Sequence, residues 1–424
     1  MLSPRLPLIA LLCATACASD PSDDSTETST SGDASTADAT SSGPPTPTGS
    51  DPGDTDSADS TGATGGTSAD SGTTDADGAV GCDGVPLLAV PEDTSLPGPW
   101  PVGARAGVVD DLAFEVWYPA EPGSDAGASK LRYDIRAALP DSETAKIPDD
   151  ANPWQDCECY RDLPVDAAHG PYPVILFVHG TAGFRSQSLE FVTHWASRGF
   201  VVVAADHPGL WLKDLLGSLC GVPAPAQDLG GDLATLLAAV RAPAGDLAFL
   251  ADRVDGGRVA MSGHSAGGFA VESAGAEAQV VMPMAGAGVS PGAALRSVLV
   301  LGAQSDKVVN YSQQQDGYAD SPAPKRLVGL ADAGHLAFSS LCSLSNADGQ
   351  DFLEIAAEYD ICGANIAGAL FDCSPDYLPD PEAWQIVNYV TSAALEETLH
   401  CSAAGDNFSG LADKFSGVGE FLAE

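Results

Sequence analysis

The sequence predicts an α/β fold, a doubly wound and mostly parallel sheet entered through antiparallel strands. Two observations predict it. Short apolar runs, typical of strands buried on both faces of a sheet, alternate with segments of helical spacing. Before them, residues 100–119 alternate apolar and polar positions around a DD turn, as in an antiparallel hairpin. Because ligands of such sheets lie beyond the carboxyl ends of the strands, we look for functional residues there.

The predicted core strands are nearly continuous apolar runs. They read YPVILFV (172–178), VVVAAD (201–206), RVAMSG (258–263), QVVMPMA (279–285) and SVLVLGA (297–303). Helices are predicted between them, in SQSLEFVTHWASRGF before Gly199, in DLGGDLATLLAAV (228–240) and directly after Ser265. A final helix, PEAWQIVNYVTSAALEETL, is predicted to pack on the sheet through Trp384, Val387 and Leu395.

The N-terminal fifth differs from the rest of the chain. Residues 1–17 carry Arg5, an apolar run and small residues before Cys17, which predicts an export signal of the lipoprotein type with Cys17 lipidated. Ordinary cleavage nearby and free secretion are the alternative. Residues 18–80 have no Lys, Arg or aromatic residue, so we expect an acidic Ser/Thr/Asp/Gly-rich disordered linker. We then expect one folded domain over residues 81–424.

The charge of the chain limits its partners. It has 59 acidic residues against 18 Lys and Arg, a net charge of −41. Such a surface repels nucleic acid and anionic membranes. We therefore expect no nucleic-acid partner and no membrane contact except through the lipid anchor. The sequence leaves the oligomeric state open.

Eight cysteines follow the signal, an even number in a chain predicted to be exported. They are Cys82, Cys157, Cys159, Cys220, Cys342, Cys362, Cys373 and Cys401. This pattern predicts up to four disulfides, with the pairing left open. A metal site at DCECY is the alternative, but no Cys or His set has the spacing of zinc ligands, so no metal is expected.

The stretch RVAMSGHSAGGF (258–269) is the strongest candidate for chemistry. It has the form of a strand, a tight turn and a helix, with Ser265 inside G-H-S-A-G. Glycines flanking a serine permit the strained turn that raises its hydroxyl above a sheet. A serine hydroxyl is a weak nucleophile that needs a base, and the base needs a third group to orient it.

The order of residues after Ser265 supplies that base and third group. Asp306 follows the last predicted parallel strand, and His335 follows another short strand in LVGLADAGHLAF. Ser, then Asp, then His is the order that this pattern requires. Asp316 and Asp332 remain alternatives for the acid, although Asp332 is only three residues from the histidine.

A tetrahedral intermediate also needs hydrogen-bond donors aimed at its oxyanion. Two backbone N–H groups are candidates. Ala266 lies at the start of the helix after Ser265, and Thr181 follows the strand and turn FVHGTAGF. The alternative for that second segment is a plain tight turn.

On these residues the chain resembles the α/β-hydrolases, and within them the platelet-activating-factor acetylhydrolase and dienelactone hydrolase branch. The resemblance rests on GPWPVGARAG with FEVWYPA, VILFVHGTAGF, LEFVTHWASRGFVVVAADHPG and DRVDGGRVAMSGHSAGG, and covers residues 97–340. It implies that Ser265 is the nucleophile, His335 the base and Asp306 the acid, with Thr181 and Ala266 as oxyanion donors and no cofactor.

The resemblance implies hydrolysis of small or medium carboxylic esters through an acyl-enzyme. A peptidase or amidase on the same fold is an alternative, but it usually brings a larger cap than the segment between Asp206 and Asp228 allows. Bacterial polyester hydrolases share GHS-x-GG, yet usually carry an aromatic residue where this chain has Thr181. A catalytically silent surface binding module is the non-enzyme alternative. Residues 337–382 form either a disulfide-tied rim beside His335 or a surface insertion without a role.

Overall fold

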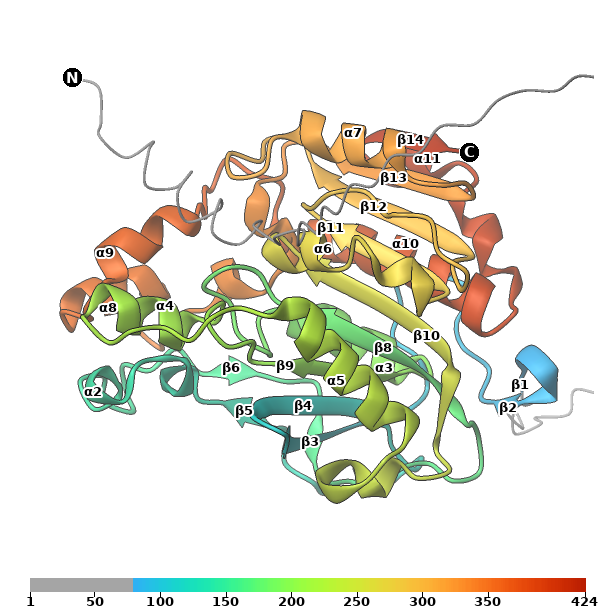
Figure 1. The fold of residues 1–424 in the computed structure, drawn as a ribbon, viewed down its shortest axis with the longest axis horizontal. Helices are drawn as coiled ribbons and strands as arrows, with labels where there is room; N and C mark the ends of the chain where they lie inside the picture. The colour runs from blue at the N-terminus through green and yellow to red at the C-terminus, as the bar shows by residue number, and fades with distance from the viewer. Residues whose placement is uncertain (1–78) are drawn as a thin grey trace, which may run out of the picture. The chain divides into compact units, whose positions relative to one another are not determined.

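The computed structural model describes residues 79–424, in which helices lie on both faces of one large sheet (Figure 1). The predicted signal peptide, the lipidation site Cys17 and nearly all of the predicted linker lie outside the described residues. The first described strand begins at Ala79, two residues before the predicted start of the domain.

The strands predicted from apolar runs are all present, and several short strands accompany them. The strands are β1 (Ala79–Val80), β2 (Pro86–Leu87), β3 (Val102–Val109), β4 (Leu112–Pro119), β5 (Arg132–Tyr133), β6 (Gln155–Asp156), β7 (Tyr160–Arg161), β8 (Tyr172–Val178), β9 (Val201–Ala205), β10 (Val254–His264), β11 (Val280–Met284), β12 (Ser297–Ala303), β13 (Lys325–Leu330) and β14 (Val418–Ala423).

The helices predicted between the core strands are present as well. The α-helices are α2 (Asp141–Thr144), α3 (Leu189–Ser197), α4 (Leu212–Leu219), α5 (Leu229–Arg241), α6 (Ala266–Ala270), α7 (Tyr311–Asp320), α8 (Phe352–Glu358), α9 (Ala364–Ala367), α10 (Asp380–Leu399) and α11 (Leu411–Lys414). The helix after Ser265 is short, and the sequence did not indicate α2, α4, α7, α8, α9 or α11.

The main sheet has ten strands in the order β14-β13-β12-β11-β10-β8-β9-β4-β3-β7. The strands from β9 to β13 pair in parallel. The hairpin of β3 and β4 is antiparallel and joins the sheet through β4 and β9. This arrangement confirms the predicted α/β-hydrolase fold, and the antiparallel edge strand β14 is an addition that the sequence did not predict.

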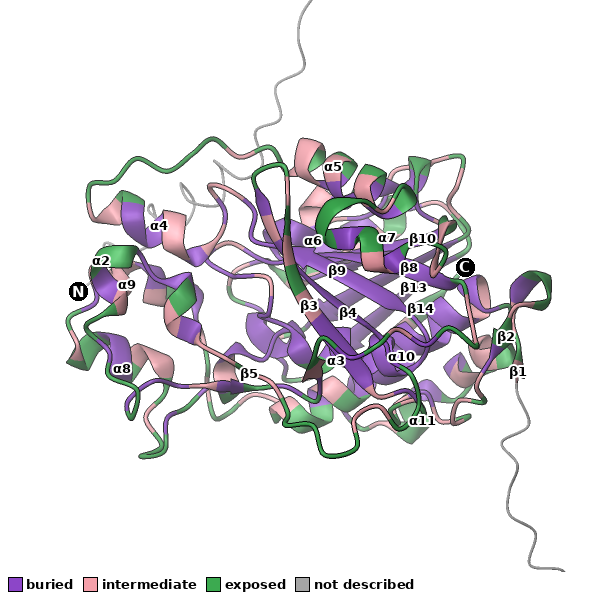
Figure 2. Ribbon diagram, turned by 90° about the horizontal axis from the view of Figure 1, so that it is seen from below, coloured by how far each residue is buried: buried purple, intermediate pink, exposed green. Residues whose placement is uncertain are grey.

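Apolar side chains on the two faces of the sheet form two cores, because successive residues of a strand point to opposite faces. In β8, Phe177 packs in the core shared with α3 and α10, while Leu176 packs in the core shared with α5. Figure 2 shows buried residues concentrated along these central strands. As predicted, α10 packs on the sheet, with Val387 and Leu395 fully buried and Trp384 partly buried.

A third apolar cluster lies beyond the sheet and covers one end of the molecule; we call it the cap. Helices α2, α4, α8 and α9 gather at this end, on the left of Figures 1 and 2. Residues 135–151, 212–216 and 336–371 supply most of it, and Ala182 and Phe184 from the segment after β8 complete the cluster. The predicted insertion thus forms a large part of the cap.

Four disulfides join all eight cysteines that follow the signal, as the even number predicted. The pairs are Cys82–Cys401, Cys157–Cys159, Cys220–Cys362 and Cys342–Cys373. The DCECY cysteines are therefore bonded to each other and form no metal site. Two pairs hold the cap, one within residues 337–382 and one joining them to the end of α4.

Candidate active site

Ser265 lies in a sharp turn between strand β10 and helix α6, as predicted. Its φ is 56° and its ψ is −120°, a backbone conformation that residues other than glycine rarely adopt. The turn is held from below, because the backbone N–H of Ser265 donates to the carbonyl of Met284 at 2.9 Å. Ser265 itself therefore has the strained backbone conformation, and the turn places its side chain at the carboxyl edge of the sheet.

The glycines around Ser265 are required by close packing. A Cβ on Gly267 would lie 2.1 Å from the carbonyl oxygen of Val178, and one on Gly263 would lie 2.3 Å from the carbonyl of Gly267. The sequence pattern predicts that these glycines permit the turn. In the structure they let α6 approach β8, while Ser265 carries the unusual backbone angles.

His335 and Asp306, 29 residues apart in sequence, meet beside Ser265. Nδ1 of His335 lies 2.8 Å from Oδ2 of Asp306, and both side chains are buried. The other carboxylate oxygen accepts the backbone N–H groups of Val308 and Val309 at 2.8 and 2.9 Å. Because a carboxylate only accepts, the proton of a neutral His335 is held on Nδ1, and Nε2 keeps its lone pair.

The other acids considered from sequence lie elsewhere. Among residues 79–424, only Asp306 has a carboxylate within hydrogen-bond distance of the His335 ring. Asp316 lines a separate surface pocket beside α7. Asp332 has a positive φ of 53° in the turn before His335, and its carbonyl accepts from Leu378.

Ser265 and His335 line one small pocket together with Thr181. The space among its lining atoms, part of which is open to solvent, is about 360 Å³, and its other walls include Leu341 and Phe371. No hydrogen bond joins the Ser265 hydroxyl to the His335 ring in the described part of the chain. Such bonds between nucleophile and base are often long before a substrate binds.

The backbone N–H groups of Thr181 and Ala266 have no acceptor within residues 79–424. Thr181 follows β8 and Ala266 is the first residue of α6, so the two residues lie on either side of Ser265. The N–H of the preceding Gly180, in contrast, donates to the side chain of Gln187 at 3.1 Å. Both groups predicted as oxyanion donors are therefore without an acceptor among the described residues.

A second histidine supports this arrangement. Nε2 of His264 lies 2.9 Å from the carbonyl of His335, so it carries the proton and donates. Its Nδ1 accepts from the amide of Gln187 at 3.1 Å. Gln187 thereby joins the turn at Gly180 to the residue before Ser265, and His264 joins that residue to the backbone of His335.

Burial keeps several histidines neutral. Desolvation lowers the pKa of His179 to about 3 and the pKa of His264 well below its ordinary value. It also lowers the pKa of His194 and of His400 to about 3. These side chains therefore stay neutral at neutral pH and act there as fixed hydrogen-bonding groups.

We therefore expect the fold to lose stability as the pH falls below about 6.5. In the unfolded chain these histidines take up protons near their ordinary pKa of 6.5, whereas in the folded chain they do so only near 3. These histidines therefore cost no stability well above pH 6.5, and their protonation in the unfolded chain lowers the free energy of unfolding increasingly as the pH falls toward 3. Thermal unfolding midpoints at several pH values measure it.

A matched pair of variants isolates this effect from the titration of the many carboxylates. His194→Gln keeps a donor for the carbonyl of Thr94, which His194 contacts at 2.9 Å, and should flatten the dependence on pH. His400→Gln likewise keeps a donor for the carbonyl of Gly199, which His400 contacts at 3.3 Å, and should flatten the dependence as well. Equal slopes in all three proteins would contradict the assignment.

Between residues 79 and 424, no group of three or more His, Cys, Asp or Glu side chains is arranged to hold a metal ion. None of the helices in that part of the chain has the length and apolarity needed to cross a membrane.

Comparison with known proteins gives one family. The family model described as platelet-activating factor acetylhydrolase, isoform II, matches residues 154–209. The chain has the α/β-hydrolase fold, and this match supports its similarity to the acetylhydrolase-like branch of that fold. No curated protein matches it. The matched residues include β8, β9 and the turn with Thr181, and they end before Ser265.

Sequence reasoning missed several residues that shape the site of this α/β-hydrolase. Gln187 gave no signal, because a polar residue before a helix is ordinary. His264 belongs to the motif itself, but only its contact with His335 shows what it does. Gln314, whose amide donates to Oδ2 of Asp306 at 3.2 Å, comes from α7 and is not near any motif.

Proposed function

We propose that this α/β-hydrolase is an exported serine esterase that cleaves carboxylic esters of small or medium acyl groups. The observation that supports the proposal best is the pairing of His335 with Asp306 beside a serine in a strained turn. The similarity to the acetylhydrolases is in keeping with an ester-cleaving hydrolase. The four disulfides are in keeping with an extracellular location.

In the proposed reaction, Nε2 of His335 takes the proton of the Ser265 hydroxyl as its oxygen attacks the ester carbonyl. Asp306 holds the ring and stabilises the imidazolium that forms. The N–H groups of Thr181 and Ala266 donate to the oxyanion of the tetrahedral intermediate. His335 then gives the proton to the departing alcohol, which leaves an acyl group on Ser265.

Water completes the cycle. His335 takes a proton from a water molecule, whose oxygen attacks the acyl-enzyme, and the ester bond to Ser265 breaks as the proton returns to the serine. The products are one carboxylic acid and one alcohol. No oxidant, reductant or further reactant enters this balance.

Labelling with a fluorophosphonate tests the nucleophile. We expect the purified, oxidised protein to gain one adduct by intact-mass spectrometry, and the Ser265→Ala variant to gain none. Ser290→Ala, which changes a serine in the loop after β11, is the matched control and should label like the wild type. A labelled Ser265→Ala protein, or an unlabelled but folded wild type, would contradict the proposal.

Substrate panels separate the alternatives. Turnover of p-nitrophenyl esters without turnover of aminoacyl amides supports the esterase over a peptidase or amidase. The resemblance to polyester hydrolases stays a prediction, which release of soluble acids from a polyester film would support. A folded protein that binds esters but turns over none would favour the binding module.

A further inference from the structure

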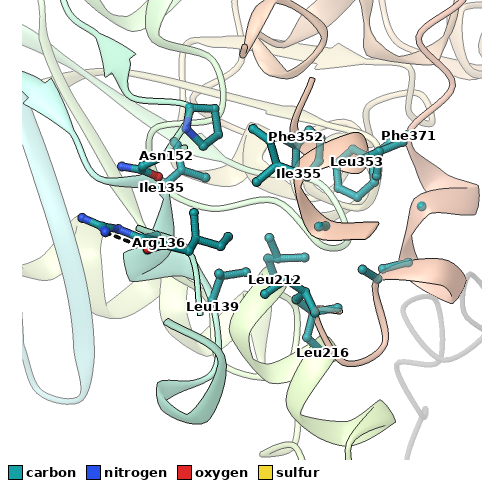
Figure 3. Close-up of a pocket in the computed structure, with 17 residues that line it drawn as sticks. Ile135, Arg136, Leu139, Asn152, Leu212, Leu216, Phe352, Leu353, Ile355 and Phe371 are labelled. Atoms are coloured by element: carbon teal, nitrogen blue, oxygen red, sulfur yellow. Dashed lines mark hydrogen bonds between the residues drawn. The ribbon is translucent and has the colours of Figure 1, made fainter. Parts of the chain in front are cut away.

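A second cavity lies under the cap, and the proposed chemistry does not use it. The space among its lining atoms, part of which is open to solvent, is about 510 Å³, compared with about 360 Å³ at Ser265. Leu212 and Leu216 of α4 line it from one side, and Phe352 and Ile355 of α8 from another (Figure 3). Charged groups are almost absent from its walls, so it is suited to an apolar ligand.

The cavity adjoins the pocket at Ser265 through one side chain. Phe371 lines both spaces. Its ring meets that of Phe352 edge-on, with centroids 4.8 Å apart. Leu336, Leu341 and Leu370, which line the pocket at Ser265, belong to the same buried cluster as the walls of the cavity. The side chains that separate the pocket at Ser265 from the cavity are therefore apolar.

The polar groups of the cavity lie at its other end. In Figure 3, Asn152 and Arg136 are on the side away from Phe371. Arg136 is engaged, since its guanidinium contacts the carboxylates of Asp134 and Asp149, both at 2.7 Å. Oδ1 of Asn152 is buried and has no hydrogen-bond partner within residues 79–424. A chain that enters past Phe371 meets only apolar groups before it reaches this end.

The walls of the cavity are fixed covalently. The Cys220–Cys362 disulfide joins the end of α4 to the segment just before α9, and both of these helices line the cavity. A wall held in this way resists collapse when the cavity is empty, because a disulfide restricts how far the two segments separate or shift.

We propose that this cavity binds an aliphatic chain of medium length carried by the ester substrate. The inference rests on the proposed esterase function and names its substrate class. The chain passes Phe371 while the ester carbonyl lies at Ser265. Each methylene that leaves water for the cavity is expected to raise kcat/KM by about fourfold until the cavity is filled.

Filling the cavity tests the proposal. Ala356 of α8 is buried and lines it, so Ala356→Phe places a ring inside. We expect kcat/KM for p-nitrophenyl octanoate to fall at least about tenfold, and that for the butyrate ester to change by less than about twofold. The neighbouring Ala357 is exposed and does not line the cavity, so Ala357→Phe is the matched control and should change neither value.

Two substrate series identify which part of the ester carries the chain. One lengthens the acyl group of p-nitrophenyl esters, and the other lengthens the alcohol of alkyl acetates. A selective loss in either series for Ala356→Phe supports the proposal and assigns the chain to the acid or to the alcohol. Unchanged preference for long chains in both series, in a folded variant, would overturn it.

A second variant keeps the test decisive if Ala356→Phe does not fold. Ala364 of α9 also lines the cavity and is partly exposed, so Ala364→Phe is less demanding on the core. It should give the same selective loss. Failure of the esterase proposal itself would look different, because the wild type would then show no fluorophosphonate adduct and no turnover of either chain length.

Discussion

Replacing Asp306 by Asn is expected to lower kcat for ester hydrolysis by about 10⁴, the loss that the same change causes in a serine protease triad. When the amide nitrogen of the introduced Asn takes the position of Oδ2, it presents an N–H group to Nδ1 of His335, where the carboxylate presented an acceptor. The proton of the imidazole then moves to Nε2. A protonated Nε2 cannot accept the proton of the Ser265 hydroxyl. The backbone N–H groups of Val308 and Val309 still find an acceptor in the remaining oxygen, so the fold should be kept.

Steady-state kinetics with p-nitrophenyl butyrate measure this loss, and circular dichroism checks the fold. Asp332→Asn is the matched control, because Asp332 was the rival acid and Asn tolerates its positive φ. That variant should keep its activity within about twofold. A similar loss in both variants, or a folded Asp306→Asn protein with more than about a tenth of the wild-type kcat, would contradict the proposed role.

The largest effect on stability is expected at Glu396. Its carboxylate pairs with Arg198, and both side chains are almost completely buried between α3 and α10. The guanidinium also donates to the carbonyls of Leu96 and Pro91 at 2.6 and 2.9 Å. Glu396→Gln leaves this charge buried without its counter-ion, which should lower the free energy of unfolding by about 3–5 kcal/mol.

Urea unfolding of the oxidised protein measures the change. The exposed pair of Arg241 and Glu277 offers the control, because Glu277→Gln should cost less than about 1 kcal/mol. The double variant Arg198→Met with Glu396→Leu should lose less than Glu396→Gln alone, since no uncompensated charge remains. A single variant within about 1 kcal/mol of the wild type would show that the pair is not needed for stability.

The core of the fold could be predicted because its strands have an unusually clear pattern. A run such as YPVILFV is apolar at every position, which few structures other than a strand buried on both faces accommodate. Edge strands lack this signal. In β14 only Val418 is buried, so nothing in VGEFLA distinguishes it from a loop.

The site divides in the same way. Ser265 and His335 lie at strand ends that the sequence marks with glycines and turn residues, and their meeting follows from the order of the strands. The cap does not follow from any one segment. The residues between Asp206 and Asp228 looked too short for a cap, yet they contribute α4 to a cluster completed by residues 135–151 and 336–371. Contacts between such distant segments have no periodicity that reveals them.

The insertion at 337–382 shows how much the pairing of cysteines decides. Both the rim beside His335 and the idle surface loop were compatible with its sequence. The Cys342–Cys373 bond folds it on itself, and Leu341 and Phe371 then reach the pocket at Ser265. The structure therefore supports the rim.

The Cys82–Cys401 disulfide has a mechanical consequence. It bonds Cys82, the fourth described residue, to Cys401, which lies just after α10, and so links the start of the domain covalently to the end of this helix. The disulfide lies near β1 and β2, at the opposite end of the molecule from α4 and α8 (Figure 1). A force applied to the chain at Cys82 is therefore transmitted through the disulfide to the end of α10, and not only through the long stretch of polypeptide in between.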